Sequence, residues 1–415
     1  MNIKKKERKD DGGRRPAVGE RKAQRTRVVI SNTNALNVPD IELMTAEGVV
    51  DENNVGKVMA LPVTTVDSLR AVGAFKNTQG WKFFRTPSTL IRKETVEMAR
   101  KLDEAAKGEA IRQVLIGEKK SGKSVLLLQA LAHAFMRDWV VINYREAREL
   151  TMGFTDYAPI PNTDPTRYSQ PALTATLLTS IVQANRDILS KLTTALTHNP
   201  PVTLPQGTSL LRLAELATND PDIALPVFHA LWSELTYKPP ADAPPASQRP
   251  PVLLAVDALA HFMRPSAYLS ADAQTIHAHD LDLIQHFSSC LSGASALPNG
   301  GAVIAAMNNS DVPSAKSLNF ALARAEAIQK AKKAEGEAVD VPTWNPYEEL
   351  DERVFGCFDP AVVEVVRLGG VSKEEARGVM DYWIKSGMCR KEMRSKMVNE
   401  LWTLSGRGVI GELER

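Results

Sequence analysis

One run of eight residues constrains the fold of this chain more than any other feature. Residues 117–124 read Gly-Glu-Lys-Lys-Ser-Gly-Lys-Ser and match the pattern G-x-x-x-x-G-K-[ST] in full. Its glycines allow a loop whose backbone N–H groups point inward at phosphate oxygens, and the helix that follows adds the positive end of its dipole. Such a loop needs a strand before it and a helix after it. The run therefore predicts an α/β fold.

The same pattern assigns roles to the residues of this P-loop. Lys123 would neutralise the β- and γ-phosphates of a purine nucleoside triphosphate, and the hydroxyl of Ser124 would ligate magnesium. Residue frequencies alone would produce such a match roughly once in a hundred chains of this size. The loop residues expected to contact the nucleotide are Gly117, Lys119, Lys120, Ser121, Gly122, Lys123, Ser124 and Val125.

Short apolar runs predict the strands of one buried, mainly parallel sheet. The first run, 112–116, leads into the P-loop, and residues 123–137 after the loop have helical composition. This strand, loop and helix stand in the order that the motif requires. The later strands are expected at residues 138–144, 252–257, 301–307 and 362–368.

The intervals between these runs are mainly of helical composition. Residues 151–250 interrupt the alternation with helices over 171–192 and 208–237, the second broken near Pro221, and a Pro-rich surface loop follows from 238 to 251. Residues 28–93 are expected to be irregular, with short extended pieces. Further helices are expected at residues 93–107, 275–291, 314–340 and 372–386, the last opened by a capping box of Ser372 and Glu375.

These elements divide the chain into four parts. Within residues 46–107, Phe75 and Trp81 could stack on a base, although such a cluster more commonly attaches an irregular segment to a core. The fold expected is that of an additional-strand P-loop NTPase, similar to the AAA+ and signal-transduction (STAND) ATPases. The parts are a basic extended arm (1–45), an irregular segment packing on the core (46–107), a P-loop nucleotide-binding domain with a helical insertion near 155–250 (108–315), and a C-terminal strand and helical subdomain (316–415).

A carboxylate is also expected near the P-loop, where it holds magnesium through water. Asp257 ends the apolar run 252–257 and is the candidate for this role beside Ser124. Ala258 follows, at the position where many ATPases of this layout place a glutamate that polarises the attacking water. The next carboxylate in the chain is Asp272. Hydrolysis is therefore expected to be slow or absent.

A polar residue follows the run 301–307. Asn308 stands where related P-loop proteins keep a side chain that contacts the γ-phosphate or water, although a strand-end asparagine is also a common turn former. Residues 308–311 also resemble the guanine-reading pattern N-K-x-D, with asparagine in the lysine place. Because no D-x-x-G follows Asp257, that similarity is weak. The choice between guanine and adenine stays open.

The net charge of +2 is unevenly distributed. Residues 1–27 hold eleven Lys or Arg and four acids, which gives this first part of the arm a charge of +7. Such an arm is typical of a tail that lies on nucleic-acid phosphates, and also of a solvated terminus. Its acids, and the lack of serine before Ser31, are unlike a mitochondrial targeting peptide. The predicted RNA-binding residues are Lys4, Lys5, Lys6, Arg14, Arg15, Arg25 and Arg27.

The composition is that of a soluble globular protein, with 43% hydrophobic and 24% charged residues in 415. The longest apolar run, 125–136, is shorter than the ~20 residues of a membrane span. Cys290, Cys357 and Cys389 form no close pair, so free and mostly buried thiols in a reducing compartment are expected. His277 and His279 are taken as ordinary polar residues on a helix.

Several segments outside the P-loop are similar to one family in order and spacing, over about residues 85–406. They comprise Arg85 to Pro87, Ile91 to Lys93, Leu126, Leu127, Trp139 to Val141, Asn143, Tyr144, Leu254 to Asp257, Tyr382, Trp383 and Leu401 to Gly406. Together with the P-loop they resemble the death-associated protein 3 family, P-loop proteins of the mitochondrial small ribosomal subunit.

The resemblance implies a structural component of the small-subunit head in the mitochondrial matrix. Such a protein binds GTP or GDP, with ATP as the other candidate, and magnesium. It contacts ribosomal RNA and neighbouring mitochondrial ribosomal proteins, works in mitochondrial translation and does not act as a free monomer. The nucleotide would then be mainly structural, stabilising the folded domain by linkage.

The alternative is an AAA+ or STAND-type ATPase that remodels a protein partner. The missing glutamate at Ala258 speaks against it, as does the lack of an evident arginine finger, for which Arg324 and Arg353 are the candidates. A nucleic-acid helicase or motor would need further motifs, which the chain lacks.

Overall fold

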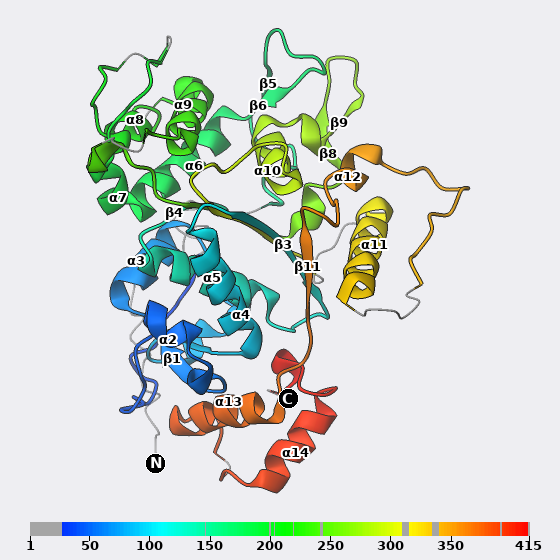
Figure 1. Cartoon of the computed structure of the whole chain (residues 1–415). Helices are drawn as coiled ribbons and strands as arrows, with labels where there is room; N and C mark the ends of the chain where they lie inside the picture. The colour runs from blue at the N-terminus through cyan, green and yellow to red at the C-terminus, as the bar shows by residue number, and fades with distance from the viewer. Residues whose placement is uncertain are drawn as a thin grey trace, which may run out of the picture.

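A parallel sheet forms the centre of the molecule (Figure 1). The order of its five strands is β11-β3-β10-β7-β4, and each neighbouring pair is parallel. The strands are β3 (Ala110–Gly117), β4 (Val140–Tyr144), β7 (Val252–Asp257), β10 (Gly301–Ala306) and β11 (Glu364–Leu368). The computed structural model describes residues 27–145, 147–198, 201–202, 204–218, 220–240, 244–308, 315–333, 340–390 and 392–413. The α/β class and the five predicted strands are confirmed.

Both faces of the sheet are buried, because successive side chains of each strand enter different cores. Val114 and Leu254 belong to one core, whereas their neighbours Leu115 and Leu253 belong to the other. This two-sided burial explains why the strands read as continuous apolar runs.

One face is covered by helices from the N-terminal half (Figure 1). They are α2 (Ala46–Val50), α3 (Val63–Ala71), α4 (Lys93–Ala105) and α5 (Lys123–Met136). The irregular structure predicted for residues 28–93 is wrong in part, because this range contains α2 and α3. The β-branched run Val63 to Val66 at the start of α3 has a low helix propensity, so the sequence does not indicate a helix there. Packing on α5 and on α6 (Pro171–Ala184) stabilises the helical form.

The predicted helical insertion covers the opposite face of the sheet. Leu178 and Phe228 from this insertion share a core with Val256 of β7. The break near Pro221 is confirmed, and a second break occurs at Asn185. The helices on this face are α6, α7 (Arg186–Lys191), α8 (Leu210–Glu215), α9 (Ala224–Thr236), α10 (Asp282–Ser292), α11 (Lys316–Lys333) and α12 (Glu352–Phe355).

The helix predicted over residues 275–291 begins only at Asp282. The preceding residues form β9 (Thr275–His277), which pairs with β8 (Pro265–Leu269). That pairing satisfies the backbone of a β-branched stretch that could also have continued a helix. The placement on a helix is therefore wrong for His277, which ends β9, whereas His279 lies in the short 3₁₀ helix η7 (Ala278–Asp280); their rings pack edge to face with centroids 4.8 Å apart.

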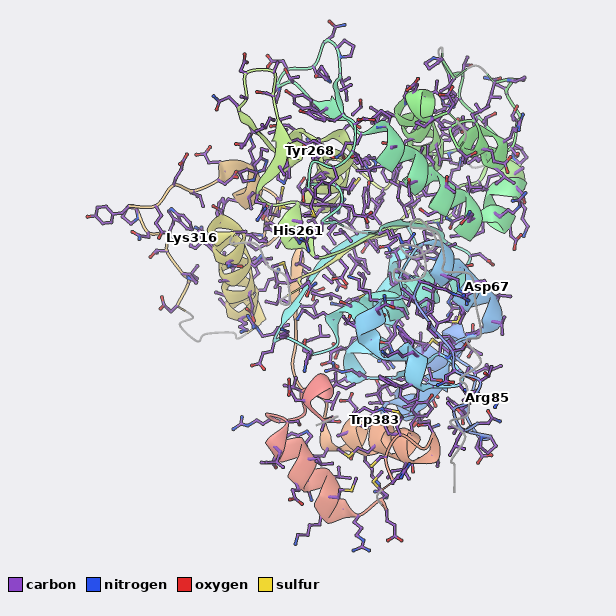
Figure 2. All side chains as sticks on the ribbon, turned by 180° about the vertical axis from the view of Figure 1, so that it is seen from behind. Asp67, Arg85, His261, Tyr268, Lys316 and Trp383 are labelled. Atoms are coloured by element: carbon purple, nitrogen blue, oxygen red, sulfur yellow. The ribbon has the colours of Figure 1, made fainter. Side chains whose placement is uncertain are left out.

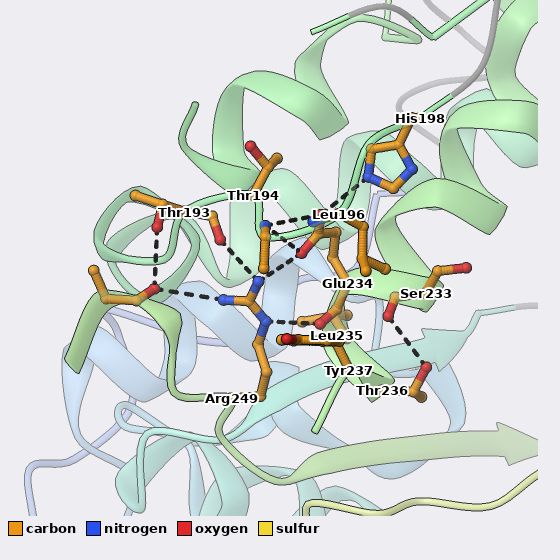
Figure 3. A network of polar contacts seen from close by, with 12 residues as sticks. Thr193, Thr194, Leu196, His198, Ser233, Glu234, Leu235, Thr236, Tyr237 and Arg249 are labelled. Carbon is orange, nitrogen blue, oxygen red and sulfur yellow. Dashed lines mark hydrogen bonds and ion pairs between the residues drawn. The ribbon is translucent and has the colours of Figure 1, made fainter. Parts of the chain in front are cut away.

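The Pro-rich loop before β7 is attached to the core by a buried ion pair (Figure 3). Arg249 donates to a carboxylate oxygen of Glu234 at 2.6 Å, and neither side chain is exposed. Glu234 also accepts hydrogen bonds from the backbone N–H groups of Ala195 and Leu196. The prediction of a surface loop over 238–251 is thus wrong for Arg249.

A small C-terminal part packs below the N-terminal helices (Figure 1). It contains α13 (Lys373–Lys385), α14 (Ser395–Leu404) and the short 3₁₀ helix η8 (Ile410–Glu412). The capping box is confirmed, since Ser372 and Glu375 each accept a hydrogen bond from the other's backbone N–H. Figure 2 shows Trp383 in this part and Tyr268 of β8 near the other end of the molecule.

The cysteines follow the prediction of free thiols. Cys290 and Cys357 are buried, and Cys389 is partly exposed. Burial raises the pKa of Cys290 to about 11, so this thiol stays protonated. Among the helices that the structure describes, none is both long and apolar enough to cross a bilayer.

Candidate nucleotide-binding site

The loop between β3 and α5 has a backbone that depends on its glycines. Gly117 and Gly122 have φ angles of +146° and +99°, where residues with a Cβ atom are strained. A Cβ atom at Gly117 would lie 2.4 Å from the carbonyl oxygen of Leu368 in β11. The loop therefore turns directly against the neighbouring strand, and position 117 admits only glycine.

Lys123 is the first residue of α5, and its side chain turns back into the loop. Its Nζ atom donates hydrogen bonds to the carbonyl oxygens of Gly117 (2.9 Å) and Glu118 (2.6 Å). Burial lowers the pKa of this ammonium group, and the charges of Asp257 and Glu118 partly oppose the shift. The ammonium group is thus held among uncharged carbonyl partners, which an anion could replace with stronger, charge-assisted bonds.

The N-terminus of α5 is a second element suited to an anion. The first N–H groups of a helix have no partner within it and lie at the positive end of its dipole. Ser124 and Val125 are in this first turn and are partly buried, and the N–H of Val125 donates to the carbonyl oxygen of Gly122 at 3.0 Å. The turn faces the same loop as Lys123, so the ammonium group and the helix end act on one place.

Arg92 connects the loop to two other parts of the chain. Its buried guanidinium donates to the carbonyl oxygens of Ser121 (2.8 Å) and Gly369 (3.2 Å) and pairs with Glu94 (2.9 Å). The loop backbone is therefore held between the start of α4 and the end of β11.

The C-terminal segment also contacts the loop. Lys120 Nζ pairs with a carboxylate oxygen of Glu412 at 3.0 Å, and the backbone N–H of Gly411 donates to the carbonyl oxygen of Lys120 at 3.3 Å. Lys119 is exposed. Of the two adjacent lysines predicted to contact nucleotide, Lys120 thus has a partner within the chain.

Asp257 lies at the same edge of the sheet as the loop, level with Ala306 in the neighbouring strand. Its Oδ1 atom accepts a hydrogen bond from the backbone N–H of Ala258 at 2.8 Å. Its Oδ2 atom accepts one from Lys76 Nζ at 2.5 Å. Magnesium binding at Ser124 and Asp257 stays a prediction, but both carboxylate oxygens already have a donor, and one donor is a cation.

The remaining predicted residues are distributed unevenly around this edge. Asn308 follows β10 and is partly buried, and its contact with a phosphate stays a prediction. Residues 309–311 of the suggested guanine pattern lie outside the described residues. The arginine-finger candidates have other partners: Arg324 lies over the ring of Phe355, and Arg353 pairs with Asp280 at 3.0 Å.

The predicted RNA-binding arm lies almost wholly outside the described residues. Arg27 is the described member, and it is exposed. The members outside are Lys4, Lys5, Lys6, Arg14, Arg15 and Arg25.

Lys76 is a residue of this site that the sequence pattern did not indicate. It lies 181 residues before Asp257 in the chain, and no motif joins the two. Arg92 lies in a segment that resembles the family, and the resemblance implies no role for it. A buried position of Arg92 could be suspected from the apolar Leu90 and Ile91 that precede it, whereas Lys76 follows an aromatic residue in an otherwise polar turn.

Comparison with known proteins then decides the family. A family model described as mitochondrial ribosomal death-associated protein 3 matches residues 89–415. The chain belongs to this family. The resemblance to the death-associated protein 3 family that was predicted from segments over residues 85–406 is confirmed.

Two relatives of this death-associated protein 3 family member carry the name small ribosomal subunit protein mS29. The relative from Neurospora crassa is 44% identical over 420 residues, which cover 100% of this chain and 86% of the relative. The relative from Schizosaccharomyces pombe is 25% identical over 361 residues, which cover 85% of this chain and 69% of the relative.

Proposed function

We propose that the chain holds a guanine nucleotide, GTP or GDP, in the loop from Gly117 to Ser124. The observation that carries the proposal is the convergence of the buried Lys123 ammonium and the N-terminus of α5 on a loop with the required glycine conformations. ATP is the other candidate, since nothing in the described residues selects the base.

The setting is the mitochondrial ribosome. As a member of the mitochondrial ribosomal death-associated protein 3 family, with relatives named as small-subunit proteins, the chain is a structural constituent of the mitochondrial small ribosomal subunit in the matrix. We extend this to contacts with ribosomal RNA through the arm from Lys4 to Arg27, to contacts with neighbouring ribosomal proteins, and to a role in translation. The charge of +7 on residues 1–27 supports the RNA contact.

The nucleotide would act mainly as a structural ligand. The loop is held by Arg92, by the end of β11 and by the segment around Gly411, so a ligand in it would stabilise elements far apart in the chain. At a concentration a hundredfold above its Kd, a ligand that binds only the folded state adds about 2.7 kcal/mol of stability. Ala258 supplies no general base, which supports retention rather than hydrolysis.

The two residues expected to hold magnesium differ in how well they suit the ion. The P-loop class would hold it at Ser124 and Asp257, where it would offset the negative charge of the phosphates. The Ser124 hydroxyl suits this role. Asp257 does not offer an open carboxylate, because Lys76 and the N–H of Ala258 already occupy its oxygens.

The binding test uses purified full-length protein and fluorescent GDP. We expect micromolar or tighter binding, and a loss of about a hundredfold for Lys123→Met, because charge-assisted phosphate bonds are removed. The exposed Lys107→Met variant is the matched control and should bind as wild type does. Absence of binding in the wild type, or equal binding by Lys123→Met, would refute the proposal.

The same protein can test the alternative of a remodelling ATPase. Turnover of ATP or GTP at about 1 per second would favour an enzyme, since working enzymes reach such rates. Chromatography of the nucleotide released from denatured protein would identify the base.

A further inference from the structure

A lysine from the N-terminal half delivers its charge to the carboxylate that the P-loop class uses for magnesium. Lys76 Nζ lies 2.5 Å from Asp257 Oδ2, with 25% of the lysine side chain and 7% of the aspartate side chain exposed. The pair is therefore largely shielded from water. The attraction between opposite charges is stronger in such a place than at the exposed surface.

The backbone around Lys76 is fixed by its neighbours. Phe75 and Trp81 are buried and pack edge to face with centroids 5.2 Å apart. Gln79 Oε1 accepts hydrogen bonds from the backbone N–H of Lys76 at 2.8 Å and from Trp81 Nε1 at 2.6 Å. The aromatic pair thus attaches this segment to the core, and the turn that it supports directs Lys76 to Asp257.

The same segment is also fastened to the sheet. Asn143 Nδ2, from the last part of β4, donates to the carbonyl oxygen of Val72 at 2.9 Å. Together with the packing of α3 on α5, this bond holds the segment beside the edge of the sheet where Asp257 lies. Lys76 therefore reaches its partner from a supported position.

A divalent cation at the same oxygen would meet a competitor. The ammonium of Lys76 already neutralises Asp257, and a second cation within a few ångströms would be repelled by it. Displacing Lys76 would leave its charge without a partner in a partly buried place, which is costly. Lys123 adds a second positive charge near the same carboxylate. The donor set thus favours ammonium over magnesium.

We propose that Lys76 takes the place of magnesium at this site, so that a nucleoside diphosphate is held by Lys76 and Lys123 and binds without a divalent cation. This inference rests on the proposed nucleotide binding. It adds Lys76 as a residue that sets the metal requirement of the site.

The experiment measures GDP affinity by calorimetry with magnesium and with excess EDTA, using wild type and Lys76→Met. In the wild type, EDTA should change the Kd by less than about threefold. Lys76→Met should bind GDP in EDTA about tenfold or more weakly than wild type, and magnesium should restore part of this loss. Lys82→Met, in the same segment and exposed, should behave as wild type in both buffers.

Two results would overturn the inference. One is a wild-type Kd that rises by about threefold or more in EDTA. The other is a Lys76→Met variant that binds GDP in EDTA as well as wild type does. A variant that binds GDP more tightly than wild type when magnesium is present would also overturn the inference, because Lys76 would then compete with the ligand. If no buffer gives any GDP binding, the proposed function itself fails, and the two failures are thus distinct.

Lys76→Met leaves Asp257 unpaired and could unfold. The double variant Lys76→Met/Asp257→Asn removes both charges, and circular dichroism checks its fold. If Lys76 supplies the cation, this folded double variant also loses about tenfold or more in GDP affinity in EDTA. An affinity equal to that of wild type would overturn the inference.

Discussion

The side-chain amide of Asn185 pairs with both backbone polar groups of Val141. The N–H of Val141 donates to Asn185 Oδ1 at 2.8 Å, and Asn185 Nδ2 donates to the carbonyl oxygen of Val141 at 2.9 Å. Val141 lies on β4, an outer strand, so the amide stands where a further strand would pair. At the opposite edge of the sheet, Gln329 donates to the carbonyl oxygen of Val363 and accepts a hydrogen bond from the N–H of Val365.

Replacing Asn185 with alanine should lower the free energy of unfolding by about 2–4 kcal/mol, because the buried N–H and C=O of Val141 lose their partners. Urea unfolding measures this change. The control is Asn399→Ala on exposed helix surface, which should cost no more than about 0.5 kcal/mol. A cost for Asn185→Ala as small as the control's would show that the edge is satisfied in another way.

The pair of Glu234 and Arg249 should be one of the most sensitive in the insertion. Glu234→Gln leaves the fully buried guanidinium without its counter-charge, at an expected cost of about 3–5 kcal/mol. Because both single variants break the same pair, Glu234→Gln/Arg249→Met should cost clearly less than the sum of the singles. Strictly additive losses in urea unfolding would contradict this coupling. The exposed pair of Glu392 and Arg394 offers a control, in which Glu392→Gln should have little effect.

The glycine requirement of the loop can be tested with two neighbouring positions. Gly117→Ala adds a Cβ atom against the carbonyl oxygen of Leu368 in a strained backbone, and should destabilise the fold by about 2–4 kcal/mol. Gly369→Ala is the matched control, because a Cβ atom there meets nothing within 4 Å. Thermal unfolding compares the two. Equal losses, or none for Gly117→Ala, would mean that the loop adapts.

Acid should destabilise the protein through His286. Burial lowers the pKa of this ring from 6.5 to about 3, and its Nδ1 atom is hydrogen-bonded to the Tyr144 hydroxyl at 2.8 Å. Above pH 6.5 the ring is neutral in both the folded and the unfolded protein, and protonation of His286 takes nothing from the free energy of unfolding. As the pH falls from 6.5 toward 3, His286 is protonated in the unfolded chain but not in the folded protein. The free energy of unfolding therefore decreases over this range.

The expected loss from this ring between pH 7 and pH 5 is about 2 kcal/mol. His286→Gln, which keeps a polar partner for Tyr144 but does not titrate, should show a smaller decrease in urea unfolding over this range. His279, whose pKa is lowered to about 4, remains in the variant and keeps part of the slope. A variant as acid-sensitive as wild type would exclude His286 as the cause.

The features foreseen from the sequence are those encoded by short-range patterns. The apolar runs predicted all strands of the central sheet because parallel strands are buried on both faces, and the capping box at Ser372 marked the start of α13. The P-loop predicted its own strand and helix. Where a β-branched stretch could form either element, as in α3 and β9, tertiary packing made the choice.

The features that were missed depend on contacts between distant parts of the chain. Lys76 meets Asp257, and Arg249 meets Glu234 inside a loop whose prolines indicated a surface position. No local pattern predicts which buried charges will find partners, because that depends on how the segments pack. The nucleotide and magnesium contacts predicted from the sequence are tested by the binding experiments above.

The strand order also has a consequence for folding kinetics. β3, which ends at the P-loop, pairs with strands that begin at Gly301 and Glu364, far along the chain. Contacts of such high contact order close large loops and form slowly. Until they form, the apolar β3 has no neighbours on either side and is prone to aggregation. We therefore expect the P-loop to mature late in folding, and the newly made chain to depend on chaperones until the sheet closes.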